Sequence, residues 1–215
     1  MTVAISRLYD DYSTASQVVR DLEAAGLRPD DISIIANNAD NWYRDDRGRK
    51  MDRIDRDHDG KDDRVEGAEA GAGIGAVVGG TAGLLAGLGI LAIPGVGPVV
   101  AAGWLAALAT GALAGGAAGG IIGALTQSGV SKEDAHVYAE GLRRGGALVT
   151  ARVPDGERTR YETILDRAAV NIRERGEAYR KEGWKSFDES APAYSAEQAR
   201  REREIEASSK IGRPL

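Results

Sequence analysis

A long glycine-rich stretch with a single charge, residues 67–128, is the feature that most constrains the fold of this chain. Between Glu69 and Lys132 no residue is charged, whereas charges occur every few positions elsewhere. Its glycines recur at intervals of four in two series, namely Gly71, Gly75, Gly79, Gly83 and Gly87, and then Gly111, Gly115, Gly119 and Gly123. Residues four apart share one face of a helix, so each series would form a strip that lets another helix backbone approach closely.

A proline- and glycine-rich segment divides this stretch into two arms. Residues 93–98 read I-P-G-V-G-P, a composition that cannot continue a helix. As helices, the arms 70–93 and 98–125 would be about 36 Å and about 42 Å long. We therefore predict a glycine-zipper helical hairpin, in which both glycine series serve as helix-packing residues within one copy or between copies.

The predicted hairpin fits two settings. Each arm is long enough to cross a hydrocarbon core of about 30 Å. Large apolar residues become rare along the second arm, however, which suits a hairpin buried inside a soluble homo-oligomer. We favour association with the bacterial inner membrane, with the charged parts in the cytoplasm. The alternative is a soluble cytoplasmic filament, shell or particle. The first twelve residues lack the features of a signal peptide, so we expect any membrane entry to be internal.

The segments on either side of the stretch predict one small α+β domain that the stretch interrupts. Residues 2–9 and 32–36 have the patterns of strands, and a helical stripe lies between them. A helix capped by Ser131 and a strand at 147–153 follow the stretch. Segments 1–36 and 129–154 together predict a split, three-stranded, ferredoxin-like α/β domain.

Two further segments follow this domain. Residues 155–178 carry an amphipathic stripe and predict a helix that docks on the sheet or on another subunit. Residues 179–215 predict an extended tail with a short charged helix. Its isolated aromatic residues, Trp184, Phe187 and Tyr194, suit anchors to a partner surface, and the alternative is a disordered tail in which they are incidental.

Residues 37–66 form a charged, acidic linker that contains a candidate calcium loop. The pattern D-x-D-x-D-G-x5-E is met, and its ligands would be the residues Asp55, Asp57, Asp59, Lys61 (through its carbonyl) and Glu66. Asp62 stands where an EF-hand loop has a hydrophobic residue, and chance acidity explains the same pattern in so acidic a segment. Calcium would make the linker responsive, and no other cofactor is expected.

Several function classes are disfavoured by composition. The net charge of −5 leaves no basic excess for nucleic acid, and the absence of cysteine excludes disulfides and thiol nucleophiles. His58 lies in the linker and His136 on a predicted surface helix, so neither suggests an active site. The run GAGIGAVVGG does not follow a strand, as a dinucleotide fingerprint would. We expect no catalytic residue, no small-molecule substrate and no nucleic-acid partner.

The arrangement resembles a bacterial family whose members are described as general stress or low-temperature-induced proteins with a heat-induced-stress-type domain. The resemblance covers residues 2–36, 71–123 and 128–153, including A-I-P-G-V-G-P and S-G-V-S-K-E-D-A-H-x-Y-A-E-G-L-R-R-G-G-A-L-V-T-A-R-V. The tail at 183–198 is similar to tails of some members. The resemblance implies a stress-linked, non-enzymatic, often membrane-associated protein and transfers no catalytic residue. We expect a structural protein that self-assembles through the hairpin, with itself and, in the membrane setting, a lipid bilayer as partners.

Overall fold

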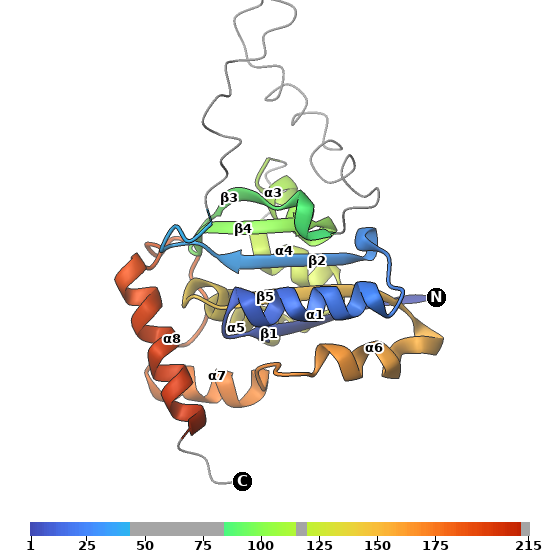
Figure 1. The fold of residues 1–215 in the computed structure, drawn as a ribbon. Helices are drawn as coiled ribbons and strands as arrows, with labels where there is room; N and C mark the ends of the chain where they lie inside the picture. The colour runs from blue at the N-terminus through green and yellow to red at the C-terminus, as the bar shows by residue number, and fades with distance from the viewer. Residues whose placement is uncertain (44–83, 115–119, 212–215) are drawn as a thin grey trace, which may run out of the picture.

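The computed structural model describes residues 1–43, 84–114 and 120–211, which form a mixed α/β fold (Figure 1). The strands are β1 (Thr2–Tyr9), β2 (Ile32–Asn37), β3 (Gly89–Ile93), β4 (Gly97–Gly103) and β5 (Ala147–Pro154). The α-helices are α1 (Tyr12–Ala24), α3 (Trp104–Ala114), α4 (Gly120–Gln127), α5 (Lys132–Arg143), α6 (Arg158–Leu165), α7 (Ile172–Lys181) and α8 (Ala196–Ile211). Short 3₁₀ turns are η1 (Pro29–Asp31), η3 (Leu84–Gly87) and η4 (Asp155–Glu157).

The strands form one antiparallel sheet in the order β1-β5-β2-β4-β3. β5 lies between β1 and β2, and α1 connects β1 to β2 along the chain. The strands expected at 2–9, 32–36 and 147–153 are present as β1, β2 and β5. The sheet nevertheless has five strands, whereas the sequence predicted three.

The two additional strands correct the prediction of a helical hairpin at 70–93 and 98–125. Residues of both arms next to I-P-G-V-G-P form the β-hairpin β3–β4, which joins the sheet beside β2. Ile90, Ile93, Val99 and Val100 are β-branched and favour strands, whereas each glycine in a helix costs about 1 kcal/mol relative to alanine. Pairing with β2 satisfies the backbone groups of β4 that a helix would have satisfied internally.

The second predicted arm is also not one helix where it is described. α3 follows β4 directly, and α4 packs against α3 rather than continuing it. The residues between these two helices, 115–119, lie outside the described part of the chain.

Helices cover both faces of the sheet and create two apolar cores (Figure 1). On one face, α1 and α6 pack on β1, β5 and β2, with Val19, Leu22 and Ile164 among the buried side chains. On the other face, α3, α4 and α5 enclose a second cluster that includes Leu105 and Leu142. The cluster residues of β2 and β5 alternate between the two cores, as the two-residue period of a strand requires.

The amphipathic segment 155–178 is divided between these two cores, which corrects the prediction of one helix. Ile164 and Leu165 of α6 are buried in the first core, whereas Val170 belongs to the second. The chain passes around the edge of β1 between them, and Ala168 adopts a positive φ of 57° in this crossing. The α6 half of the apolar stripe is buried as its pattern indicates, but Ala168 is exposed, and the two halves of the segment serve opposite faces of the sheet.

The C-terminal tail folds back on its own chain. Phe187 is 5% exposed within the second core, Trp184 meets Tyr179 edge to face, and the Arg143 guanidinium lies over the Tyr194 ring. The aromatic residues expected to anchor the tail therefore do so on the surface of this chain.

A buried ion-pair cluster holds the tail and α8 to the end of α5. The Arg144 side chain, 8% exposed, donates to Glu140 at 2.8 Å and to Glu182 at 2.7 Å, and reaches Glu202 at 3.3 Å. Its guanidinium also lies 4.0 Å from the centre of the Tyr179 ring. Burial lowers the pKa of Arg144, but hydrogen bonds to Glu140 and Glu182 outweigh it and raise that pKa above its ordinary value. This cation joins α5, α7 and α8.

We expect Arg144→Met to lower the free energy of unfolding by about 3 kcal/mol, because the buried Glu140 carboxylate would keep only its longer contact with Arg143, at 3.5 Å. Arg158→Met is the matched control, since its pair with Glu162 is exposed and worth at most about 1 kcal/mol. Urea unfolding of both variants measures the difference, and equal small losses would contradict the role of Arg144.

Glu206 makes the docking of α8 sensitive to pH. Burial, together with the nearby Asp10 carboxylate, raises the pKa of Glu206 to about 7, although its contact with Arg175 opposes the rise. A carboxyl with a raised pKa in the folded state stabilises that state at low pH, and this contribution is lost as pH rises through the folded pKa. We expect unfolding free energy to fall between about pH 4.5 and about pH 7 for this reason.

Glu206→Gln should flatten that pH dependence, because the amide does not titrate. Glu204→Gln, on the exposed side of the same helix, should leave it unchanged. Urea unfolding at pH 5 and pH 8 gives the slope for each protein. A wild-type slope in Glu206→Gln would show that other groups carry it.

Candidate assembly surface

The two edges of the sheet differ in how they are protected. At β1, the backbone N–H of Val170 donates to the carbonyl of Leu8 at 2.8 Å. Arg7 also pairs with Asp166 at 2.6 Å. The segment that crosses between α6 and α7 therefore occupies part of the edge of β1, which is no longer a free template for another strand.

The opposite edge is strand β3, which is the last in the sheet and pairs with β4 alone. Within residues 1–43, 84–114 and 120–211, no other strand pairs with its outer side. Its sequence, Gly-Ile-Leu-Ala-Ile, contains no charge and no proline. Native edge strands are commonly protected by lysine, proline or a bulge, and β3 has none of these devices.

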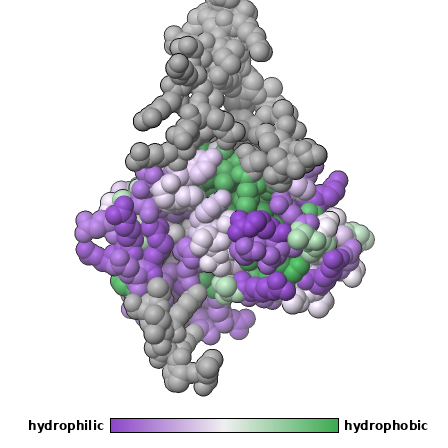
Figure 2. All heavy atoms as spheres, in the orientation of Figure 1, coloured by the Kyte–Doolittle hydropathy of each residue, from purple (hydrophilic) through white to green (hydrophobic). Residues whose placement is uncertain are grey.

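Apolar side chains accompany this edge. Ile90 is 47% exposed and Ala92 is exposed, whereas Leu91 and Ile93 on the other face pack into or against the second core. Figure 2 shows hydrophobic residues gathered at the end of the molecule where β3 and β4 lie. We define the assembly surface as the outer side of β3 with Ile90 and Ala92.

The start of β3 is held by contacts with distant segments. Before the strand, the Leu84 N–H donates to the Glu23 carboxylate of α1 at 2.7 Å, and the Tyr43 hydroxyl donates to the Leu88 carbonyl at 3.3 Å. Both contacts place the start of β3 against the core. The strand is thus a fixed part of the sheet.

The turn between β3 and β4 is fixed by glycine and by the C-terminal tail. Gly95 and Gly97 have positive φ angles of 71° and 98°, and the Val96 N–H donates to Ile93 across the turn at 3.1 Å. A side chain at Gly95 would lie 2.7 Å from the Asp188 carbonyl oxygen and 2.8 Å from the Glu189 Cα. The tail backbone packs so closely on this turn that only glycine fits.

The predicted glycine zipper is only partly described. Gly71, Gly75, Gly79, Gly83, Gly115 and Gly119 lie outside the described residues. Of the others, Gly87 lies in η3, Gly111 in α3 and Gly123 in α4. Gly111 and Gly123 are therefore on two different helices, and their four-residue series does not run along a single one.

The candidate calcium ligands Asp55, Asp57, Asp59, Lys61 and Glu66 also lie outside the described residues. In the part of the chain that is described, no group of three or more His, Cys, Asp or Glu side chains is arranged to hold a metal ion. None of the helices described there has both the length and the apolar character needed to span a bilayer.

Sequence reasoning missed the edge strand, although a signal for it was present. The residues Ile90, Ile93, Val96, Val99 and Val100 flank the Pro94-Gly95 turn, a pattern of β-branched residues around a turn that is typical of a hairpin. The regular spacing of the glycines favoured a helix instead.

Comparisons of the chain with protein-family models, with curated proteins and with solved structures find no match.

We expect Gly95→Ala to destabilise the fold by about 1–3 kcal/mol, because alanine is strained at this φ and its Cβ meets the tail backbone. Gly156→Ala is the control, since an added Cβ there would meet no atom within 4 Å and its φ lies outside the left-handed region. Thermal unfolding measures stability, and limited proteolysis of the tail reports its release. An unchanged melting temperature in Gly95→Ala would contradict the close packing of tail and turn.

Proposed function

We propose that this chain is a non-enzymatic structural protein that self-assembles, and that strand β3 of one copy pairs with β3 of another. The observation that carries the proposal is the uncharged outer side of β3, with which no other strand pairs among residues 1–43, 84–114 and 120–211. An edge of this kind is a template for strand addition. The occupied edge of β1 makes the two ends of the sheet unequal, which favours pairing through β3.

The geometry of the strand suits a two-fold pairing. In an antiparallel pair centred on Leu91, Ile90 of one copy would lie opposite Ala92 of the other, and the same contact would repeat by symmetry. Both exposed side chains would become cross-strand neighbours on one face. The two sheets would join into a continuous one.

A five-residue strand is a small contact, so we propose that the glycine series strengthen the association. Interfaces that persist bury about 1,200 Å² or more, which exceeds what one short strand pair offers. Close approach at Gly71, Gly75, Gly79 and Gly83, which lie outside the described residues, would supply additional area, since the second series is divided between α3 and α4.

The cellular role and setting are proposals of the same kind. The resemblance to bacterial general stress proteins supports a role in the stress response. In a membrane setting, residues 89–93 and 97–103 would stay in the sheet, and α3 and α4 would stay packed on the second core rather than enter the bilayer. The alternative is a soluble homo-oligomer whose linker responds to calcium at Asp55, Asp57, Asp59, Lys61 and Glu66. The soluble setting is favoured by the incorporation of β3 and β4 into the sheet, because these residues then do not form part of a membrane-spanning helix.

Ile90→Lys should weaken self-association at least about tenfold, because pairing would bring an added charge on each copy into an apolar contact. Ile205→Lys is the matched control, since it places the same charge at another exposed isoleucine, on α8. Sedimentation velocity across a concentration series gives the mass of each protein.

Loss of association in Ile90→Lys alone would support the proposal. A wild-type protein that stays monomeric throughout, or an Ile90→Lys protein that assembles like wild type, would refute pairing through β3.

A further inference from the structure

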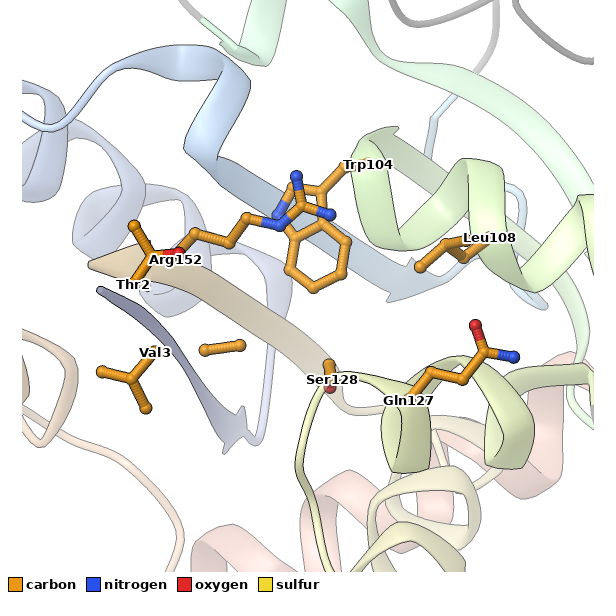
Figure 3. A pocket seen from close by; sticks show the side chains of 8 residues that line it. Thr2, Val3, Trp104, Leu108, Gln127, Ser128 and Arg152 are labelled. Atoms are coloured by element: carbon orange, nitrogen blue, oxygen red, sulfur yellow. The ribbon is translucent and has the colours of Figure 1, made fainter. Parts of the chain in front are cut away.

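A groove separates the β1–β5 edge of the sheet from helices α3 and α4 (Figure 3). Its volume is about 260 Å³, slightly below the roughly 300–1,000 Å³ of common ligand pockets, so it would admit only a small ligand. The side chains that matter for its chemistry are Arg152 of β5, Trp104 and Leu108 of α3, Gln127 at the end of α4, and Ser128. The groove lies away from the assembly surface on β3, and its chemistry is independent of the proposed function.

Arg152 supplies a cation without a carboxylate partner. It lies opposite Ala4 in the register of β1 and β5, on the sheet face that α3 and α4 cover. Among the described residues, no Asp or Glu pairs with it, whereas the half-buried or buried arginines Arg7, Arg144 and Arg175 each pair with a carboxylate. Its positive charge is therefore available to a ligand.

The aromatic ring of Trp104 fixes the orientation of this cation. The guanidinium carbon lies 3.8 Å from the centre of the ring, as a stacked cation–π pair (Figure 3). Stacking uses the face of the guanidinium and leaves the N–H groups along its edge to donate hydrogen bonds. The planar, two-pronged edge of a guanidinium matches a carboxylate.

The remaining lining provides both apolar and polar contacts. Leu108 is 36% exposed, an unusual exposure for a leucine on a helix that otherwise buries Leu105 and Ala109. The Gln127 amide and the Ser128 hydroxyl lie across the groove from Arg152 (Figure 3). The indole N–H of Trp104 is buried and has no hydrogen-bond partner among the residues that the structure describes, which is uncommon for a native protein.

We propose that this groove binds a small organic carboxylate with a short apolar body. The carboxylate accepts hydrogen bonds from the edge of the Arg152 guanidinium, and the apolar body lies against Leu108. The groove volume limits the ligand to a few carbon atoms beyond the carboxylate. Charge and apolar contact are both required, so a neutral analogue and an inorganic anion each lack one half of the interaction.

The test is a titration of the full chain with hexanoate, followed by the indole N–H resonances of its tryptophans. Trp104→Phe identifies the Trp104 resonance among those of the three tryptophans. We expect this resonance to shift saturably, with a dissociation constant on the order of 1 mM, as small ligands commonly bind. The resonances of Trp42 and Trp184, which lie outside the groove, should not follow the same curve.

Two further ligands and two variants separate the contributions. Hexanol has the apolar body without the charge, and inorganic phosphate has charge without the body, so both should bind at least tenfold more weakly than hexanoate. Arg152→Gln should weaken hexanoate at least tenfold, since a charge-assisted pair is lost. Arg173→Gln is the control, because Arg173 is an exposed arginine outside this groove.

Each result bears on the proposal. Absence of a saturable Trp104 shift up to tens of millimolar hexanoate would overturn it, as would equal binding by Arg152→Gln in a protein that keeps the wild-type melting temperature. Should Arg152→Gln unfold, Leu108→Ala offers a second variant, for which weaker hexanoate binding with unchanged phosphate binding is expected. Phosphate or hexanol binding as tightly as hexanoate would also overturn it.

Discussion

The rest of the structure depends on the pairing of β5 with both β1 and β2. This strand comes from a part of the sequence more than a hundred residues after its partners, yet it stands between them. Without β5, β1 and β2 would have no hydrogen-bonded neighbour in common, and the faces that α1 and α5 cover would not form. The insertion between β2 and α5 is therefore constrained at both ends, because the chain leaves from β2 and must return through α5 to β5, the neighbour of β2. The β3–β4 hairpin meets that constraint by extending the sheet from β2.

The chain that follows β5 covers the two edges of the sheet to different extents. The crossing from α6 to α7 covers part of β1, and the tail then packs on the β3–β4 turn, so the C-terminal part of the chain touches both ends of the sheet. The outer side of β3 is left without a strand among the described residues. Among the described residues one edge is thus partly covered and the other is not, which would direct the proposed strand addition to β3.

How much of this was predictable depends on the range of the interactions involved. Local patterns were enough to locate β1, α1, β2, α5 and β5, and the stripe of α1 matches its buried face, although Ser6 of β1 is buried as well because both faces of that strand are covered. The β3–β4 hairpin was missed because its pairing with β2, a contact between distant residues, outweighed the helical spacing of glycines. The division of 155–178 at Ala168 depends on which core each half enters. The Arg152–Trp104 stack joins a strand and a helix that no sequence pattern links, so the groove became visible only in three dimensions.

The central position of β5 also determines the order in which the fold can be completed during synthesis. When β1, α1, β2 and the hairpin have left the ribosome, β5 has not yet been made, and β1 has no partner to pair with. Nascent chains with unpaired strands and exposed apolar surface are prone to aggregate and depend on chaperones. Closure of the sheet must wait for a strand of high sequence separation, which slows folding. Translation speed through residues 84–146 would then set how long the unfinished sheet is exposed.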